Sequence, residues 1–200
     1  MKKPNSLLML LLTLVIATSC QQHKTSESKS NAAGWIINPD FSSISIITTK
    51  NSKISEVSQF KTFSGTINAS NYLSVSIDLA SLETNIAIRN ERIQKHLFQT
   101  KIYPTAEIHT QLKPEDLAVG VHAISFEVDL HGVSGIVNAE FMVFEQFGNK
   151  IITLHKPLII KAETFALESG ITTLRKIAKL KSIDFTVPVN LTLSFERKNL

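Results

Sequence analysis

Histidine offers the widest range of chemistry in this sequence, because it binds metals and transfers protons near neutral pH. The chain contains six: His23, His96, His109, His122, His131 and His155. Their spacings match no zinc-binding pattern, since structural zinc sites use closely spaced pairs of cysteine or histidine. The fold could still assemble a metal site from distant histidines, but scattered strand and surface positions explain them more simply. We therefore predict no metal site and no cofactor.

Other catalytic patterns are missing from the sequence. It contains no Gly-x-Ser-x-Gly elbow, which presents a serine nucleophile on a sharp turn, and no glycine-rich loop that would hold phosphates. Asp78 and Asp129 could form an acid–base pair, but each lies on the polar side of an alternating segment, where solvated carboxylates are ordinary. We expect a protein that is not an enzyme.

The only cysteine, Cys20, follows a segment typical of an export signal. Two lysines precede an apolar stretch over residues 7–16, which is shorter than the roughly 20 residues needed to span a bilayer. Ala17-Thr18-Ser19 before the cysteine resembles the lipobox of bacterial lipoproteins, in which the cysteine becomes the lipid-carrying N-terminus. The alternative is an ordinary secretory signal that happens to contain a cysteine. We predict a signal peptide over residues 1–19, a lipid anchor on Cys20, and a location in the bacterial cell envelope, on the periplasmic side or at the cell surface.

The rest of the chain is long enough for one domain with a sizeable core. Residues 20–34 are polar and contain no large aliphatic or aromatic side chain, so we expect a flexible tether there. The folded domain should occupy residues 35–197. Without the two lysines of the signal, the 21 basic and 17 acidic residues become 19 and 17, a net charge of +2. This near-neutral balance does not indicate a nucleic-acid partner.

Alternation of apolar and polar residues indicates β-strands along most of the domain. Residues 73–79, 124–130 and 186–193 alternate with a period of two, which gives each strand one apolar and one polar face. Five further segments have the composition of strands: residues 43–49, 60–67, 106–111, 139–144 and 151–160. Glycines near residues 132 and 148 indicate hairpin turns. About eight short antiparallel strands predict a sandwich or a barrel.

Two segments break the strand pattern. Asn90 could cap a short helix that places Ile93 and Leu97 on one face. Residues 171–181 have an amphipathic pattern typical of a second helix. The cations away from its apolar face are Arg175, Lys176 and Lys179. This segment could cap an open end of the β-structure, or its cations could contact a lipid headgroup or a membrane, and the two roles are compatible.

Several motifs resemble those of the YceI-like family of bacterial periplasmic proteins. Residues 35–39, Trp-Ile-Ile-Asn-Pro, are similar to the family's Trp-x-Ile-Asp-Pro opening, and residues 60–67 match its Phe-x-x-Phe-x-Gly-x-Ile strand. Residues 75–104 resemble its most specific series, which runs from Val-Ser-Ile-Asp through Ser-Leu-Glu-Thr, Arg-Asn and Leu-Phe to Tyr-Pro. Asn38 and Asn90 stand where the family commonly has aspartate.

The resemblance implies an all-β fold, an antiparallel eight-stranded lipocalin-like barrel with one or two short helices. It also implies a lumen that binds a long apolar lipid of the isoprenoid or quinone-like class, so the expected partners are that lipid and, through Cys20, a membrane. The residues expected to line the lumen are Val75, Ile77, Leu79, Ile124, Phe126, Val128, Val187, Val189 and Leu191.

Two alternatives to a lipid carrier stay open. One is an envelope enzyme or accessory protein that uses the barrel as a scaffold and places His109 or His131 in a site. The other is a packed barrel without a ligand that acts as an interaction module.

Overall fold

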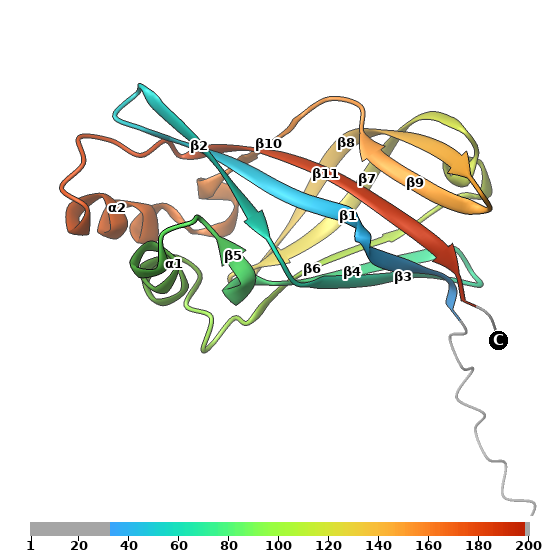
Figure 1. The fold of residues 1–200 in the computed structure, drawn as a ribbon, viewed down its shortest axis with the longest axis horizontal. Coiled ribbons are helices and arrows are strands. Elements are labelled where there is room, and N and C mark those ends of the chain that lie inside the picture. The colour runs from blue at the N-terminus through green and yellow to red at the C-terminus, as the bar shows by residue number, and fades with distance from the viewer. Residues whose placement is uncertain (1–32, 199–200) are drawn as a thin grey trace, which may run out of the picture. The chain divides into compact units, whose positions relative to one another are not determined.

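The structure, a computed structural model, describes residues 33–198. Eight strands in this part of the chain close into an antiparallel barrel, because the long first strand pairs with the last (Figure 1). In chain order they are β1 (Ala33–Lys50), β3 (Phe63–Asn68), β4 (Tyr72–Asp78), β6 (Thr105–Gln111), β7 (Gly120–Leu130), β8 (Val133–Gln146), β9 (Asn149–Leu154) and β11 (Thr186–Arg197). The predicted eight-stranded antiparallel barrel is therefore confirmed.

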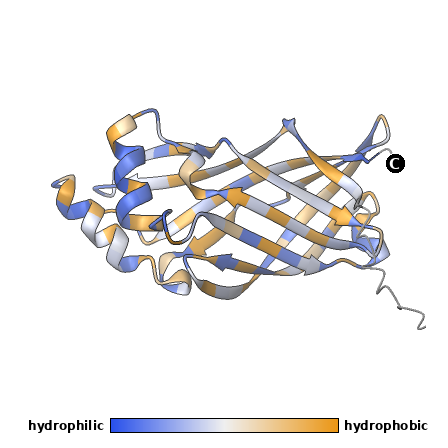
Figure 2. Cartoon of the chain, turned by 90° about the horizontal axis from the view of Figure 1, so that it is seen from below, coloured by the Kyte–Doolittle hydropathy of each residue, from blue (hydrophilic) through white to orange (hydrophobic). Residues whose placement is uncertain are grey.

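Alternation of apolar and polar residues along the strands determines which side chains face the interior. Figure 2 shows hydrophobic residues (orange) and hydrophilic residues (blue) following one another along the barrel strands. On β7, Phe126 and Val128 are buried, whereas the intervening Glu127 is exposed. Successive side chains of a strand point to opposite faces, so one register decides the inside and outside of the whole strand. The turns His131-Gly132 and Phe147-Gly148 connect β7 to β8 and β8 to β9, as the glycines predict.

Two predicted strands are each divided in two. Residues 60–67 do not form one strand: β2 (Ile54–Phe60) ends before Lys61, and β3 starts after Thr62. The backbone N–H groups of Lys61 and Thr62 donate to Ser81 Oγ, at 3.2 and 3.0 Å, which satisfies them outside the ladder. This break lets both Phe60 and Phe63 pack on the core, although they are three residues apart.

The second division separates β9 from β10 (Leu158–Lys161), where one strand over residues 151–160 was predicted. Both parts pair with β11, and Pro157 lies between them. Proline lacks a backbone N–H and cannot donate to a ladder, which accounts for an interruption at this point. A short strand β5 (Leu82–Glu83) extends the sheet beside β2.

Helical segments gather at one end of the barrel (Figure 1). They are α1 (Ala87–Ile93), the π-helical turn η2 (Gln94–Phe98) that continues it, α2 (Glu168–Ile177), and the single turns η1 (Leu79–Ser81) and η4 (Ala162–Phe165). A further turn, η3 (Pro114–Leu117), precedes β7. Within the described residues, no helix combines the length and the apolar composition needed to cross a membrane.

The predictions for the two helices were partly wrong. Asn90 lies in the middle of α1 and does not cap it. Its Oδ1 accepts hydrogen bonds from the backbone N–H and the hydroxyl of Thr84, at 3.0 and 2.6 Å, which fixes the helix to the end of β5. The second helix starts at Glu168 and ends at Ile177, three to four residues earlier than predicted.

The opposite end of the barrel is filled by side chains. The most buried are Ile67, Val75, Val143 and Phe195. The Trp35 ring lies near them, with Lys150 Nζ at 5.2 Å and Arg197 Cζ at 4.7 Å from the ring centre. We call this the closed end, because side chains fill it. The described chain also begins and ends here (Figure 1). The helical end is where the interior opens.

Candidate functional site

An apolar cavity of about 420 Å³ occupies the half of the barrel beneath the helices. Its wall comes from β1, β2, β4, β6, β7, β10 and β11, and its cover comes from α1, η2, α2 and the loop that follows α2. Most of the lining side chains are aliphatic or aromatic. Ligand pockets of about 300–1,000 Å³ are typical of small-molecule sites, so the cavity is large enough to bind a ligand.

Most of the predicted lumen residues line this cavity. They are Ile77, Leu79, Phe126, Val128, Val187, Val189 and Leu191. Val75 does not line it, because the residue lies further toward the closed end, where it is buried in the packed core. Ile124 does not line it either, and instead contributes to a groove in the barrel wall. Leu79 reaches the cavity from the turn η1 and not from a strand.

The few charged groups of the cavity lie among the segments that cover it. Lys50 from the end of β1, Arg89 and Arg92 from α1, and Asp184 from the loop before β11 all line it. Glu56 on β2 forms ion pairs with both Lys50 and Arg89, the latter through Arg89 Nη1 at 2.9 Å. The hydrogen bond from Lys50, helped by Arg89, holds the pKa of the Glu56 carboxyl below its ordinary value.

Glu56 carries one negative charge, so it neutralises only one of its two cationic partners, Lys50 and Arg89. Arg92 forms no ion pair with any other described residue, and neither does Asp184. The cavity therefore has an apolar interior and a small excess of positive charge at its mouth. Sequence reasoning missed this cluster, because Lys50, Glu56 and Arg89 come from separate elements and no local pattern connects them.

The amphipathic segment that contains α2 has its apolar and basic side chains on different sides, as the sequence pattern predicts. Ile171, Leu174 and Ala178 line the cavity, whereas Arg175, Lys176 and Lys179 do not. The helix lies very close to η2: a side chain at Gly170 would meet the His96 carbonyl oxygen at 2.7 Å. The segment thus covers the end of the barrel with its apolar side, and its three cations stand outside the cavity.

The two histidines of the alternative enzyme site are not brought together. His109 stacks on Tyr72, with ring centres 6.0 Å apart, whereas His131 packs edge-on against Tyr103 at 4.8 Å. Nδ1 of His109 and both ring nitrogens of His131 are buried without a hydrogen-bond partner in the described part of the chain. Across residues 33–198, no group of three or more His, Cys, Asp or Glu side chains is placed to hold a metal ion.

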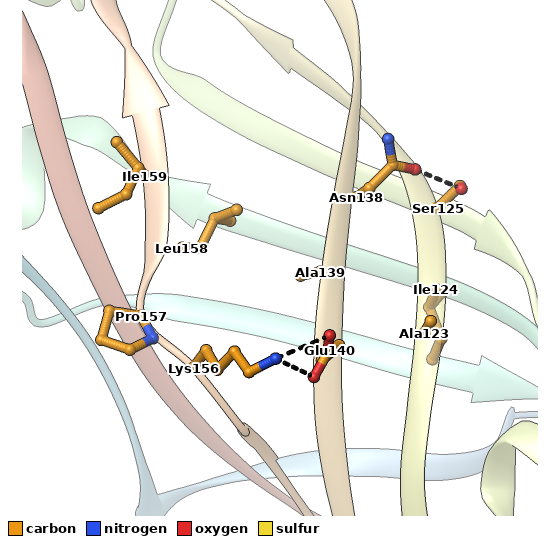
Figure 3. Close-up of a pocket in the computed structure, with 10 residues that line it drawn as sticks. All are labelled: Ala123, Ile124, Ser125, Asn138, Ala139, Glu140, Lys156, Pro157, Leu158 and Ile159. Atoms are coloured by element: carbon orange, nitrogen blue, oxygen red, sulfur yellow. Dashed lines mark hydrogen bonds and ion pairs between the residues drawn. The ribbon is translucent and has the colours of Figure 1, made fainter.

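A groove of about 490 Å³ lies in the barrel wall beside the cavity (Figure 3). It exists because β8 pairs with β9 only from Phe141 onward, and β10 pairs with β11 alone among the described strands. Lys156 forms an ion pair with Glu140 in it, at 2.9 Å. Leu158 lines both the groove and the cavity, so the two spaces share a wall.

Comparison with known proteins identifies the fold. A solved polyisoprenoid-binding domain from Saccharophagus degradans, described as implicated in plant cell wall breakdown, is 31% identical with a TM-score of 0.79, and the match covers 83% of this chain and 99% of that one. Burkholderia cenocepacia BcnA is 19% identical with a TM-score of 0.65, covering 79% and 98%. A YceI protein from Campylobacter jejuni is 19% identical with a TM-score of 0.53, covering 72% and 85%.

No curated protein matches the sequence. The model of the YceI-like domain matches residues 35–195. This match spans every strand of the closed barrel, including the motifs at residues 35–39, 60–67 and 75–104. The chain therefore belongs to the YceI-like family.

Proposed function

We propose that this protein binds a long apolar lipid of the polyisoprenoid or quinone-like class in the barrel cavity, and carries it without catalysing a reaction. The observation that carries the proposal is the aliphatic and aromatic lining of a cavity large enough for a ligand. The similar domain from Saccharophagus degradans, described as polyisoprenoid-binding, supports the same class of ligand.

The energetics favour a long chain. Each CH₂ group transferred from water to an apolar site contributes about 0.8 kcal/mol. Association costs roughly 4–15 kcal/mol in lost translational and rotational freedom. A chain therefore needs many buried carbons before binding becomes favourable, and a cavity with few polar groups offers little else to a short ligand.

The polar end of the lipid would lie at the mouth. Arg92 has no ion pair among the described residues, and Lys50 and Arg89 share one carboxylate, so these groups can donate hydrogen bonds to an acidic or carbonyl-bearing headgroup. Arg175, Lys176 and Lys179 stand outside the cavity and would contribute through longer-range attraction. In this proposal the headgroup would contact α1 and β1, and α2 would act on it only at longer range.

The anchor belongs to the same proposal. Cys20, the signal over residues 1–19 and most of the tether over residues 20–34 lie outside the described residues. The sequence Ala17-Thr18-Ser19-Cys20 supports cleavage before the cysteine and its lipidation. Two or more acyl chains give stable anchoring where a single one gives marginal binding. The protein would then work in the bacterial envelope, on the periplasmic side or at the cell surface.

Native mass spectrometry of the protein purified from its own cells, followed by lipid extraction, tests the proposal. We expect one prenyl or quinone-like lipid per chain, released when the barrel unfolds. Protein that carries no lipid and does not bind polyprenyl phosphate or ubiquinone added in detergent would instead indicate an interaction module. A stoichiometric bound metal ion would favour the enzyme or accessory alternative.

A further inference from the structure

Exposed isoleucines surround the mouth of the cavity. Ile86 and Ile88, at the start of α1, are 43% and 51% exposed, although both also line the cavity. Ile54 is 53% exposed where β2 begins, paired with Lys50 of the cavity wall. Ile177 is exposed at the end of α2. Scattered surface isoleucines are ordinary, but four around one opening form an apolar rim.

The elements that carry this rim are held together around the mouth. In the turn between β1 and β2, Asn51 Oδ1 accepts a hydrogen bond from the backbone N–H of Lys181, at 2.8 Å. The Asn51 backbone N–H donates to the Ser182 carbonyl, at 3.0 Å. The ion pair between Glu56 and Arg89 connects β2 to α1. These contacts connect the turn between β1 and β2 to the loop after α2, and β2 to α1, so the elements that carry the rim meet at one end of the barrel (Figure 1).

Charge is strongly uneven between this surface and the rest of the barrel. The segments that frame the mouth are residues 50–56, 78–103 and 168–184, which together hold ten basic and six acidic residues, a net charge of +4. The remaining described residues, 33–198 without these segments, hold seven basic and ten acidic residues, a net charge of −3. Such a polarised domain orients in an electric field, with its mouth toward negative charge.

We propose that the rim and the basic side chains around it dock the cavity mouth onto an anionic lipid bilayer. The proposal rests on the proposed function in one respect, since a lipid ligand leaves and enters a membrane. The rim isoleucines would enter the headgroup region while Lys53, Arg92, Lys176, Lys179 and Lys181 lie against anionic headgroups. Apolar residues flanked by cations are the composition of surfaces that lie in this interface. A bound lipid would then pass between cavity and bilayer without crossing water.

The test uses the mature chain from residue 20 with Cys20→Ser, which removes the lipid and leaves the barrel intact. Binding to vesicles of phosphatidylethanolamine with phosphatidylglycerol is compared with binding to phosphatidylcholine vesicles, at low and high salt. Each lysine near an anionic surface contributes about fivefold to partitioning. The mouth variant Lys53→Gln, Ile54→Ser, Lys181→Gln should therefore bind anionic vesicles at least tenfold more weakly.

A matched variant at the closed end provides the control. Phe147, 96% exposed in the turn between β8 and β9, and the exposed Lys113 and Lys198 lie away from the mouth. The variant Phe147→Ser, Lys113→Gln, Lys198→Gln should bind as the parent does. Equal losses in the two variants, or a parent that does not prefer anionic vesicles, would overturn the proposal. Both variants should still bind polyprenyl phosphate in detergent. If the parent protein itself does not bind polyprenyl phosphate, the proposed lipid-binding function is wrong, whereas the docking proposal is still judged by the vesicle experiment.

Discussion

Replacing Ile77 by glutamate should remove lipid binding while leaving a folded barrel. Ile77 is 7% exposed and lines the cavity from β4. In the empty cavity, water that enters through the mouth can hydrate the introduced carboxylate. A bound lipid chain would displace that water. Leaving a buried charge without a partner costs about 3–5 kcal/mol, which corresponds to an affinity weaker by roughly 10²-fold to 4 × 10³-fold. A fluorescent polyprenyl probe titrated against purified protein measures the loss.

Ile159→Glu is the matched control, because it makes the same change on the outside of the barrel. Ile159 is exposed on β10, pairs with Pro188, and does not line the cavity. This variant should bind the probe within threefold of wild type, and both variants should unfold cooperatively on heating. If Ile77→Glu binds the probe as tightly as Ile159→Glu does, the lipid does not lie against β4 and the reasoning fails.

Three further changes test other parts of the structure. Cys20→Ala should move the protein from the membrane to the soluble fraction of fractionated cells, and an unchanged distribution would contradict lipidation. Asn90→Ala removes both hydrogen bonds from Thr84, so it should lower the free energy of unfolding by about 1–3 kcal/mol in a urea titration. The lowered pKa of Glu56 means that its ion pairs add stability above the unfolded pKa, and that this stability is lost as pH falls below 4.5 through the folded pKa. Glu56→Gln should therefore lose less stability than wild type between pH 5 and pH 3, and parallel curves would refute this role.

The barrel was predictable because its information is local and repeated. Period-two alternation placed Phe126 and Val128 inside and Glu127 outside, and the structure has the same register. The alternation does not tell how far along a strand the cavity extends. Val75 has the same pattern as Ile77, yet it is packed in the core because its neighbours toward the closed end fill the interior.

The interruptions of the strands were not predictable from the pattern. Phe60 and Phe63 look incompatible on one regular strand, since side chains three residues apart point to opposite faces. The chain resolves this with a break at Lys61-Thr62, whose two N–H groups are satisfied by Ser81, about 20 residues away. A partner so distant in sequence gives no signal within the strand itself.

The charged residues at the mouth also differ in how well the sequence identifies them. Those within one segment were predicted, and those brought together from separate elements were not. The cations of α2 were identified because their amphipathic spacing is visible within one segment, yet the structure leaves them outside the cavity. No pattern in the sequence connects Lys50 to Arg89, but in the structure both line the cavity and both form ion pairs with Glu56. A headgroup site needs charges that converge on one point, and convergence here depends on β1, β2 and α1 meeting at the end of the barrel. Spacing within a segment therefore identifies a basic surface more readily than it identifies charges from separate elements that converge on one cavity.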